Sequence, residues 1–352
     1  MKLFKCAHCG QLVYFENSFC EICKHPLGFV PEDLNLITLV ADEGTFYSVE
    51  GDKSRRFNYC VNHNYDVCNW LVQADSSHPF CLACKLNRNI PNLGYPEQMR
   101  QWQLIEIAKH RLVYSLLQLH LPLQNKLEDP EKGLSFDFLS DTHEKVMTGH
   151  EDGLITLNIN EADDEKRELS RKQMHEPYRT LLGHFRHEVG HYYWWRLIAE
   201  SDYLGECRSL FGDERQDYDQ ALQRHYNNGA PLNWSLNFIS EYATTHPAED
   251  WAETWAHYLH IMDTLETAAA FGIAVAPGLA KKADNVTITI NTSPYLEKSF
   301  DELLKHWLPL TFAMNSLNRS MGQHDMYPFV IQPKVIEKLR FIHKVCGKLR
   351  QL

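Results

Sequence analysis

The most informative residues of the chain are the five at 187–191, His-Glu-Val-Gly-His. Apolar residues recur around them at helical spacing, and no proline interrupts the run. His187 and His191 are four residues apart, so on a helix they point to the same side. Two neutral imidazoles placed in this way can hold a zinc ion, and Glu188 can take a proton from a water molecule on that ion. The alternative is a surface helix on which all three side chains are solvated.

A second polar stretch, residues 241–257, can supply the ligand that two histidines lack. Pro247 is well placed at the start of a helix. The polar residues after it share one side of that helix: Glu249, Glu253, His257 and His260. Zinc held by two histidines needs a further ligand, usually a carboxylate from another helix. We expect Glu249 to be this ligand and Glu253 to hydrogen bond to a zinc-binding histidine. The alternative is a solvated acidic face.

A third histidine ligand on the first helix is excluded by the residues that follow. Metzincin peptidases require a glycine and a histidine seven and ten residues after the first histidine. Those positions hold Trp194 and Leu197. A carboxylate is therefore the better candidate for the third ligand.

Eight of the ten cysteines lie in the first 84 residues. The first four form two C-x-x-C knuckles: Cys6, Cys9, Cys20 and Cys23. Four thiolates close a tetrahedral zinc shell and leave no position for water, so this zinc is expected to be structural. The alternative, a redox C-x-x-C, requires one motif in a thioredoxin-like context, not two in tandem.

The next four cysteines predict a second structural zinc: Cys60, Cys68, Cys81 and Cys84. The last two form a knuckle, whereas the first two are more widely spaced and have His63 between them. The alternative places Cys60 or Cys68 in the core and completes the site with His63. Cys207 and Cys346 lie outside both groups, and we expect them to be buried small hydrophobic residues.

Composition narrows the class of protein. The 352 residues are 44% hydrophobic and 12% aromatic, as in a folded globular protein. The net charge of −11 makes nucleic acid an unlikely partner. The sequence shows no apolar signal segment, and its longest apolar run, residues 268–280, is about 13 residues long and too short to span a bilayer. We therefore expect a cytoplasmic protein without a membrane partner.

Periodicity predicts the elements that position these residues. Strands are expected at 36–40, 45–49 and 286–290, a small antiparallel sheet at 134–160, and helices at 96–120, 176–200, 214–226 and 247–265. We expect the α+β fold class, with zinc-ribbon modules followed by a mainly helical domain, which the His-Glu-x-x-His pattern indicates to be a zincin-like metallopeptidase domain. We assign residues 1–30 to the first ribbon, 31–92 to a second four-cysteine zinc module and 93–352 to the metallopeptidase domain. An exposed edge of the small sheet could bind an extended peptide as an added strand.

Over nearly its whole length, the chain resembles a bacterial family of zinc-binding metallopeptidases with an N-terminal zinc ribbon. The resemblance rests on the paired knuckles and on three longer runs, which begin at Thr148, Arg179 and Glu249: Thr-Gly-His-Glu-Asp-Gly, Arg-Thr-Leu-Leu-Gly-His-Phe-Arg-His-Glu-Val-Gly-His-Tyr and Glu-Asp-Trp-Ala-Glu-Thr-Trp-Ala-His-Tyr. It implies the fold and the class of enzyme but no substrate.

A more distant similarity links the chain to gluzincin peptidases. In these enzymes, a run Tyr-Ala-x-x-x-x-Ala-Glu-x-x-Ala-Glu supplies the third zinc ligand and a catalytic tyrosine. Residues 242–253 fit this run, which implies that Glu249 is the ligand and that the Tyr242 hydroxyl stabilises the oxyanion. Tyr242 could instead be a packed aromatic residue. The interval of about 58 residues between His191 and Glu249 is longer than in thermolysin-like enzymes.

Together these patterns predict zinc-dependent hydrolysis of a peptide or related amide bond, with one catalytic and two structural zinc ions. The expected partner is a peptide or protein substrate, and the ribbons could also bind a protein. One rival is a binding protein in which the ribbons recognise a partner and the helical domain is an inactive scaffold. Another is a latent enzyme in which the ribbons cover the cleft.

Overall fold

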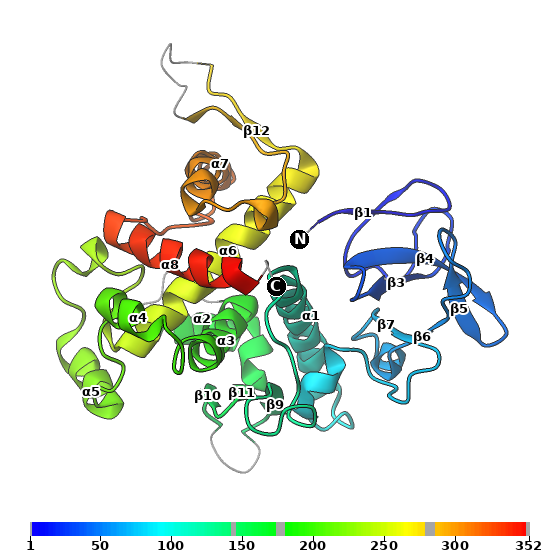
Figure 1. The fold of residues 1–352 in the computed structure, drawn as a ribbon, viewed down its shortest axis with the longest axis horizontal. Coiled ribbons are helices and arrows are strands. Elements are labelled where there is room, and N and C mark those ends of the chain that lie inside the picture. The colour runs from blue at the N-terminus through cyan, green and yellow to red at the C-terminus, as the bar shows by residue number, and fades with distance from the viewer. Residues whose placement is uncertain (1, 142–145, 174–179, 279–285, 350–352) are drawn as a thin grey trace. The chain divides into compact units, whose positions relative to one another are not determined.

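The computed structural model describes residues 2–141, 146–173, 180–278 and 286–349. The chain divides into two compact units, Met1–Asp164 and Glu165–Leu352. The first unit holds most of the strands, whereas the second is mainly helical (Figure 1). This arrangement confirms the α+β class with an N-terminal cysteine-rich region. The three predicted segments, 1–30, 31–92 and 93–352, stay predictions.

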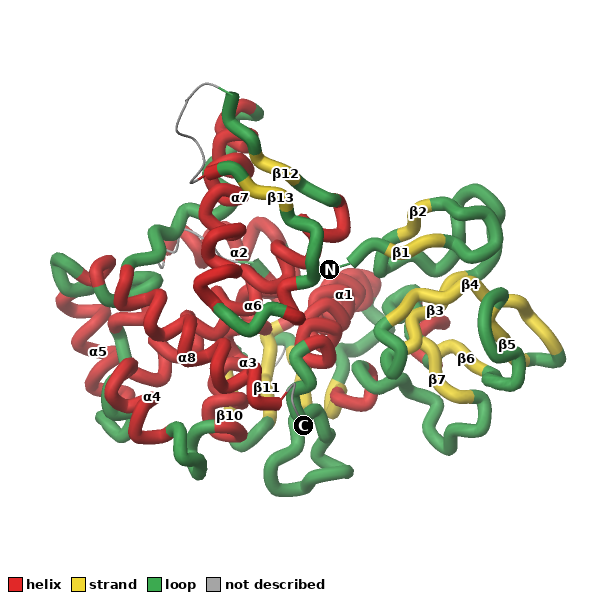
Figure 2. Tube along the Cα trace, turned by 45° about the horizontal axis from the view of Figure 1, so that its top comes forward, coloured by secondary structure: helices red, strands yellow, loops and turns green. Residues whose placement is uncertain are grey.

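The first unit begins with two antiparallel sheets, whose strands are yellow in Figure 2. A two-stranded ribbon pairs β1 with β2, and a five-stranded sheet has the order β3-β4-β5-β6-β7. The bounds are Phe4–Lys5 (β1), Leu12–Val13 (β2), Leu27–Val30 (β3), Asn35–Asp42 (β4), Thr45–Ser48 (β5), Phe57–Tyr59 (β6) and Leu71–Gln73 (β7). Strands β4 and β5 confirm the strands predicted at 36–40 and 45–49.

An aromatic cluster joins the cysteine-rich segments to the long helix α1, Pro96–Gln118. Phe29 on β3 packs against Phe15 and Trp70, with ring centroids 4.9 and 4.7 Å apart. Phe15 also contacts Tyr114 of α1 at 5.3 Å. All four rings are buried, so one core supports both cysteine groups. Helix α1 begins at the predicted proline, which needs no backbone N–H partner at that position.

The sheet predicted at 134–160 is present, but it is mixed and not antiparallel. It has four strands in the order β10-β11-β9-β8, with bounds Asn87–Asn89 (β8), Ser135–Leu139 (β9), Gly149–Glu151 (β10) and Leu154–Asn158 (β11). Only β10 and β11 are antiparallel, joined by a tight turn at Asp152 and Gly153, both with positive φ. Strand β9 runs parallel to β8 and β11. The parallel β8–β9 pair follows from α1, which provides the long crossover that such a pair requires.

Helices form the second unit, with one short hairpin. The bounds are Asp164–Gln173 (α2), Leu181–Leu197 (α3), Leu204–Phe211 (α4), Tyr218–Asn228 (α5), Pro247–Phe271 (α6), Phe300–Ser320 (α7), Pro333–Leu349 (α8), and Ala274–Val275 (β12) paired with Ile288–Thr289 (β13). Of the helix predicted at 176–200, residues 176–179 lie outside the described residues. The sheet edge proposed for peptide binding belongs to the first unit, and its role stays a prediction.

The ends of the two central helices follow from local chemistry. Thr180 caps α3, because its hydroxyl accepts a hydrogen bond from the Gly183 N–H at 2.9 Å. Helix α6 extends beyond the predicted end at 265 through good helix formers to Gly272, which ends it with φ of 62°. Among the described residues, no helix combines the length and the apolarity that a membrane span requires.

Candidate metal centre and structural zinc sites

Close packing between α3 and α6 brings the two predicted ligand stretches together. Gly190 faces α6, and a Cβ atom at this position would lie 3.0 Å from the Ala252 Cα. Trp251 donates a hydrogen bond from Nε1 to the Gly190 carbonyl at 2.8 Å. Trp255 stacks on Tyr193 with ring centroids 5.2 Å apart. The glycine within His-Glu-Val-Gly-His therefore permits the close approach of the helix that carries Glu249.

We expect Gly190→Val to destabilise the second unit by about 1–3 kcal/mol, the usual cost of overpacking a close contact. The branched side chain collides with Ala252 and with the Trp255 Cβ, which lies 3.3 Å from an added Cβ. Thermal unfolding measures the effect. Gly205→Val is the matched control, because nothing lies within 4 Å of a Cβ at that helical glycine. Equal Tm values for the two variants would contradict the close approach.

The three predicted ligands of the catalytic zinc, His187, His191 and Glu249, converge on one point. His187 Nε2 lies 3.2 Å from His191 Nε2 and 2.9 Å from Glu249 Oε2. His191 Nε2 lies 3.6 Å from Glu249 Oε1. Glu249 is only 2% exposed. These atoms form one of the groups in the described residues that could hold a metal ion.

The donor atoms fit zinc. Zinc binds nitrogen and carboxylate oxygen at about 2.0–2.2 Å, which places neighbouring tetrahedral ligands about 3.3 Å apart. His187 Nδ1 lies 2.7 Å from Glu253 Oε1, so we assign its proton to Nδ1 and a lone pair to Nε2. That lone pair faces His191. The buried Glu249 Oε2 lies 2.9 Å from His187 Nε2 and accepts no hydrogen bond of normal geometry within the described residues. A cation between these atoms would bind the lone pair of His187 Nε2 and give Glu249 Oε2 a partner.

Acidic groups surround His187. Glu253 contacts its Nδ1 and also accepts a hydrogen bond from the Ser240 hydroxyl at 2.6 Å. Burial acts to lower the pKa of His187, but Glu249 and Glu253 outweigh it and hold this pKa well above its usual range. The pair of carboxylates therefore favours a positive charge at this position, which a proton or a metal ion can supply.

Glu188, the predicted base, is buried beside the ligands. Its Oε1 lies 3.3 Å from His184 Nε2, one helical turn earlier. Burial acts to raise the pKa of Glu188, but His184, followed by His187 and His191, outweighs it and lowers this pKa below its usual range. The carboxylate is therefore ionised and able to accept a proton. Sequence reasoning did not single out His184, although its helical spacing places it on the same face.

Two tyrosines lie at the candidate metal centre, whereas the sequence indicated one. The Tyr242 ring lies 5.9 Å from that of His187. Tyr218 of α5 donates a hydrogen bond to Glu249 Oε1 at 3.0 Å and interacts with the Tyr242 hydroxyl. Burial, followed by the charge of Glu249, holds the pKa of Tyr242 well above its usual range, so its hydroxyl stays protonated. Tyr218 lies in the long interval between the ligands and had no sequence signal.

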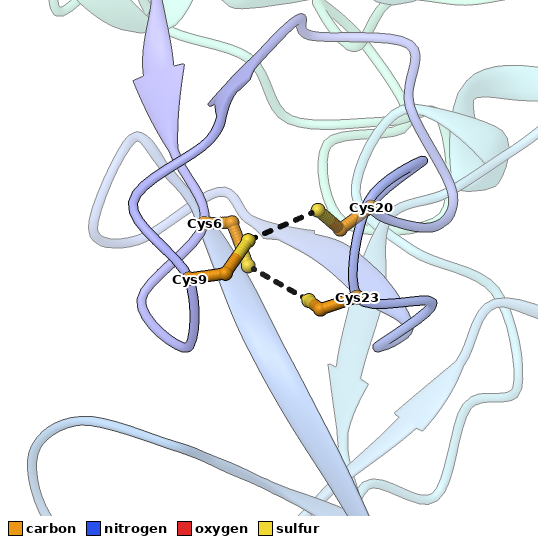
Figure 3. A group of neighbouring side chains, drawn as sticks. All are labelled: Cys6, Cys9, Cys20 and Cys23. Carbon is orange, nitrogen blue, oxygen red and sulfur yellow. Dashed lines mark hydrogen bonds between the residues drawn. The ribbon is translucent and has the colours of Figure 1, made fainter.

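The first cysteine group converges as four thiols from two similar turns (Figure 3). The Sγ atoms of Cys6 and Cys23 are 3.5 Å apart, and those of Cys9 and Cys20 are 3.6 Å apart. In each knuckle, the residue after the second cysteine has positive φ, Gly10 with 78° and Lys24 with 62°. Its N–H donates to the carbonyl of the first cysteine at 2.8 Å. These turns direct both thiols of each knuckle inward.

The second cysteine group is fully buried. Backbone N–H groups donate to three of its sulfur atoms: Trp70 to Cys68, Cys81 to Cys60, and Cys84 to Cys81. Such bonds stabilise thiolates, the form that binds zinc. His63 lies outside the group, because its Nδ1 contacts the Cys68 carbonyl at 2.8 Å and its ring stacks on Tyr59. The four-cysteine set is therefore favoured over the set with His63.

A further histidine–cysteine cluster shares its cysteine with the first four-cysteine group. His8 and His25 lie close to Cys23. Their rings are stacked, with centroids 4.0 Å apart and an angle of 24° between planes. Because Cys23 already belongs to the first four-cysteine group, we assign no separate metal ion to this cluster.

Comparison with known proteins places the chain in a family. Residues 98–345 match a family described as "Putative zinc-binding metallo-peptidase", and residues 3–95 match a family described as "zinc-ribbon domain". The first match covers well over half of the chain, so the chain belongs to this zinc-binding metallopeptidase family, as the sequence resemblance predicted.

Relatives in two mycobacteria match nearly the whole chain. The chain is 44% identical over 350 residues to uncharacterized proteins of Mycobacterium tuberculosis and Mycobacterium bovis. The match covers 99% of this chain and 96% of each relative. No solved structure matches the chain.

Proposed function

We propose that this protein is a zinc-dependent peptidase of the gluzincin type, which hydrolyses a peptide or related amide bond. The observation that carries the proposal is the convergence of His187, His191 and Glu249 with Glu188 beside them. The three converging residues would hold a zinc ion, which would supply a Lewis acid for the scissile carbonyl and for the attacking water. Two histidines and a glutamate from a second helix are a known ligand set of catalytic zinc.

The side chains around the ligands then have separate tasks. Glu188 is ionised and takes a proton from the attacking water, then returns it to the leaving amine. The protonated hydroxyl of Tyr242 donates a hydrogen bond to the oxyanion. Glu253 fixes the ring orientation of His187, and Tyr218 fixes one oxygen of Glu249. Glu188 is therefore the general base and Tyr242 the oxyanion donor. Glu253 and Tyr218 are positioning residues.

The two four-cysteine groups support two further, structural zinc ions. A peptide or protein is the proposed substrate. We place the enzyme in the cytoplasm, because the two four-cysteine groups suit thiolate–zinc sites, which persist in a reducing compartment.

Cleavage of a mixed peptide library, followed by mass spectrometry, tests the activity. The zinc-loaded protein should produce new peptide termini, and His191→Ala should produce none, because it loses a ligand while keeping all eight clustered cysteines. Absence of cleavage by both proteins would favour the rival function, in which the zinc ribbons bind a protein partner and the helical unit is a scaffold.

A further inference from the structure

We propose that His184 is a positioning residue that holds the Glu188 carboxylate in the orientation needed for proton transfer. This inference rests on the proposed peptidase function and assigns a further residue to the same site. His184 Nε2 lies 3.3 Å from Glu188 Oε1, and both residues belong to α3 at a separation of one turn. The distance is at the long end for a hydrogen bond, as catalytic contacts often are in the absence of substrate.

The burial of Glu188 makes a partner necessary. Its side chain is only 8% exposed. An ionised carboxylate away from water is costly unless a hydrogen bond or a positive charge compensates it. Without such a group, nothing on this helix holds the orientation of the Glu188 carboxylate, and the side chain can rotate towards water. His184 supplies the compensation from the same helix, so its position is fixed by the backbone.

The other two histidines on this face of α3, His187 and His191, direct their ring nitrogens at other groups. His187 directs Nδ1 to Glu253 and Nε2 to the metal centre. His191 directs Nε2 to the same centre. His184 is therefore the histidine of this face whose ring nitrogen lies next to the Glu188 carboxylate and is not directed at the ligand cluster. Its side chain is 17% exposed, which leaves it partly accessible to water.

A hydroxamate probe tests this role without a known substrate. Acetohydroxamic acid chelates zinc through two oxygens and loses its proton to a nearby base, so its affinity reports the position of Glu188. We expect His184→Phe to weaken acetohydroxamate binding about tenfold, the loss of one hydrogen bond to a charged group. His184→Gln keeps an N–H donor and should bind more tightly than His184→Phe. Calorimetry on the zinc-loaded full chain measures each Kd, and elemental analysis should find unchanged zinc in every variant.

A double-mutant cycle with Glu188→Gln separates positioning from a general structural effect. If His184 acts through Glu188, adding His184→Phe to Glu188→Gln should cause no further loss of affinity. An additive loss, or wild-type affinity in His184→Phe while Glu188→Gln binds weakly, overturns the role of His184 and leaves the peptidase proposal standing. No acetohydroxamate binding by the wild-type protein, with only two zinc ions per chain, overturns both.

Discussion

Glu188→Gln should retain its zinc and lose peptide cleavage by a factor of about 10²–10⁴, the usual contribution of a general base. The amide has nearly the same shape as the carboxylate, but it cannot accept the proton of the attacking water. Glu188 is not among the converging ligand atoms, so metal binding should be unaffected. Initial rates on a cleaved library peptide and zinc content by elemental analysis measure the two effects.

Glu206→Gln is a suitable control for this variant. Glu206 also lies on a helix of the second unit, but its side chain is 45% exposed and its partner is Lys344 on the surface. Surface ion pairs contribute little to stability, so this change should leave the rate within twofold of wild type. Full activity in Glu188→Gln would show that another group takes the proton.

Cys81→Ala should remove one zinc ion per chain and destabilise the first unit by about 4–5 kcal/mol or more. The free energy of binding a structural zinc is part of the free energy of folding, because the unfolded chain has no preformed site. Cys81 lies within the fully buried group, and its sulfur also accepts the Cys84 N–H. Loss of this ligand leaves three buried thiols without a closed zinc shell.

Cys207→Ala is the matched control for the structural site. Cys207 is equally buried, and burial raises its pKa to about 12, so it is a neutral thiol outside both cysteine groups. Its removal should cost only about 1 kcal/mol and no zinc. Thermal unfolding with elemental analysis compares the two variants. Equal zinc content in Cys81→Ala and wild type would rule out the four-cysteine assignment.

Residues close in sequence were predictable because helices and knuckles have fixed geometry. The four-residue spacing of His187 and His191 determines their common side, and the turn after Cys6-Ala-His-Cys9 determines how its thiols point. The interaction of Glu249 with these histidines was inferred from ligand chemistry and from a resemblance. The same helical rule could have identified His184.

Contacts between distant segments were not predictable in the same way. Tyr218 reaches Glu249 because α5 packs near the start of α6, and nothing in its local sequence indicates this. The direction of β9 depends on the crossover through α1, whereas the alternation of apolar residues shows only that a strand has two faces. Periodicity therefore revealed the strands of the mixed sheet but not their relative directions.

The most direct test of the central claim is zinc per chain in protein purified without added metal, compared with a His187→Ala/His191→Ala variant. The proposed sites predict about three zinc ions in the wild-type protein and about two in the variant, because both four-cysteine groups remain intact. About two zinc ions in both proteins would contradict a metal centre between α3 and α6.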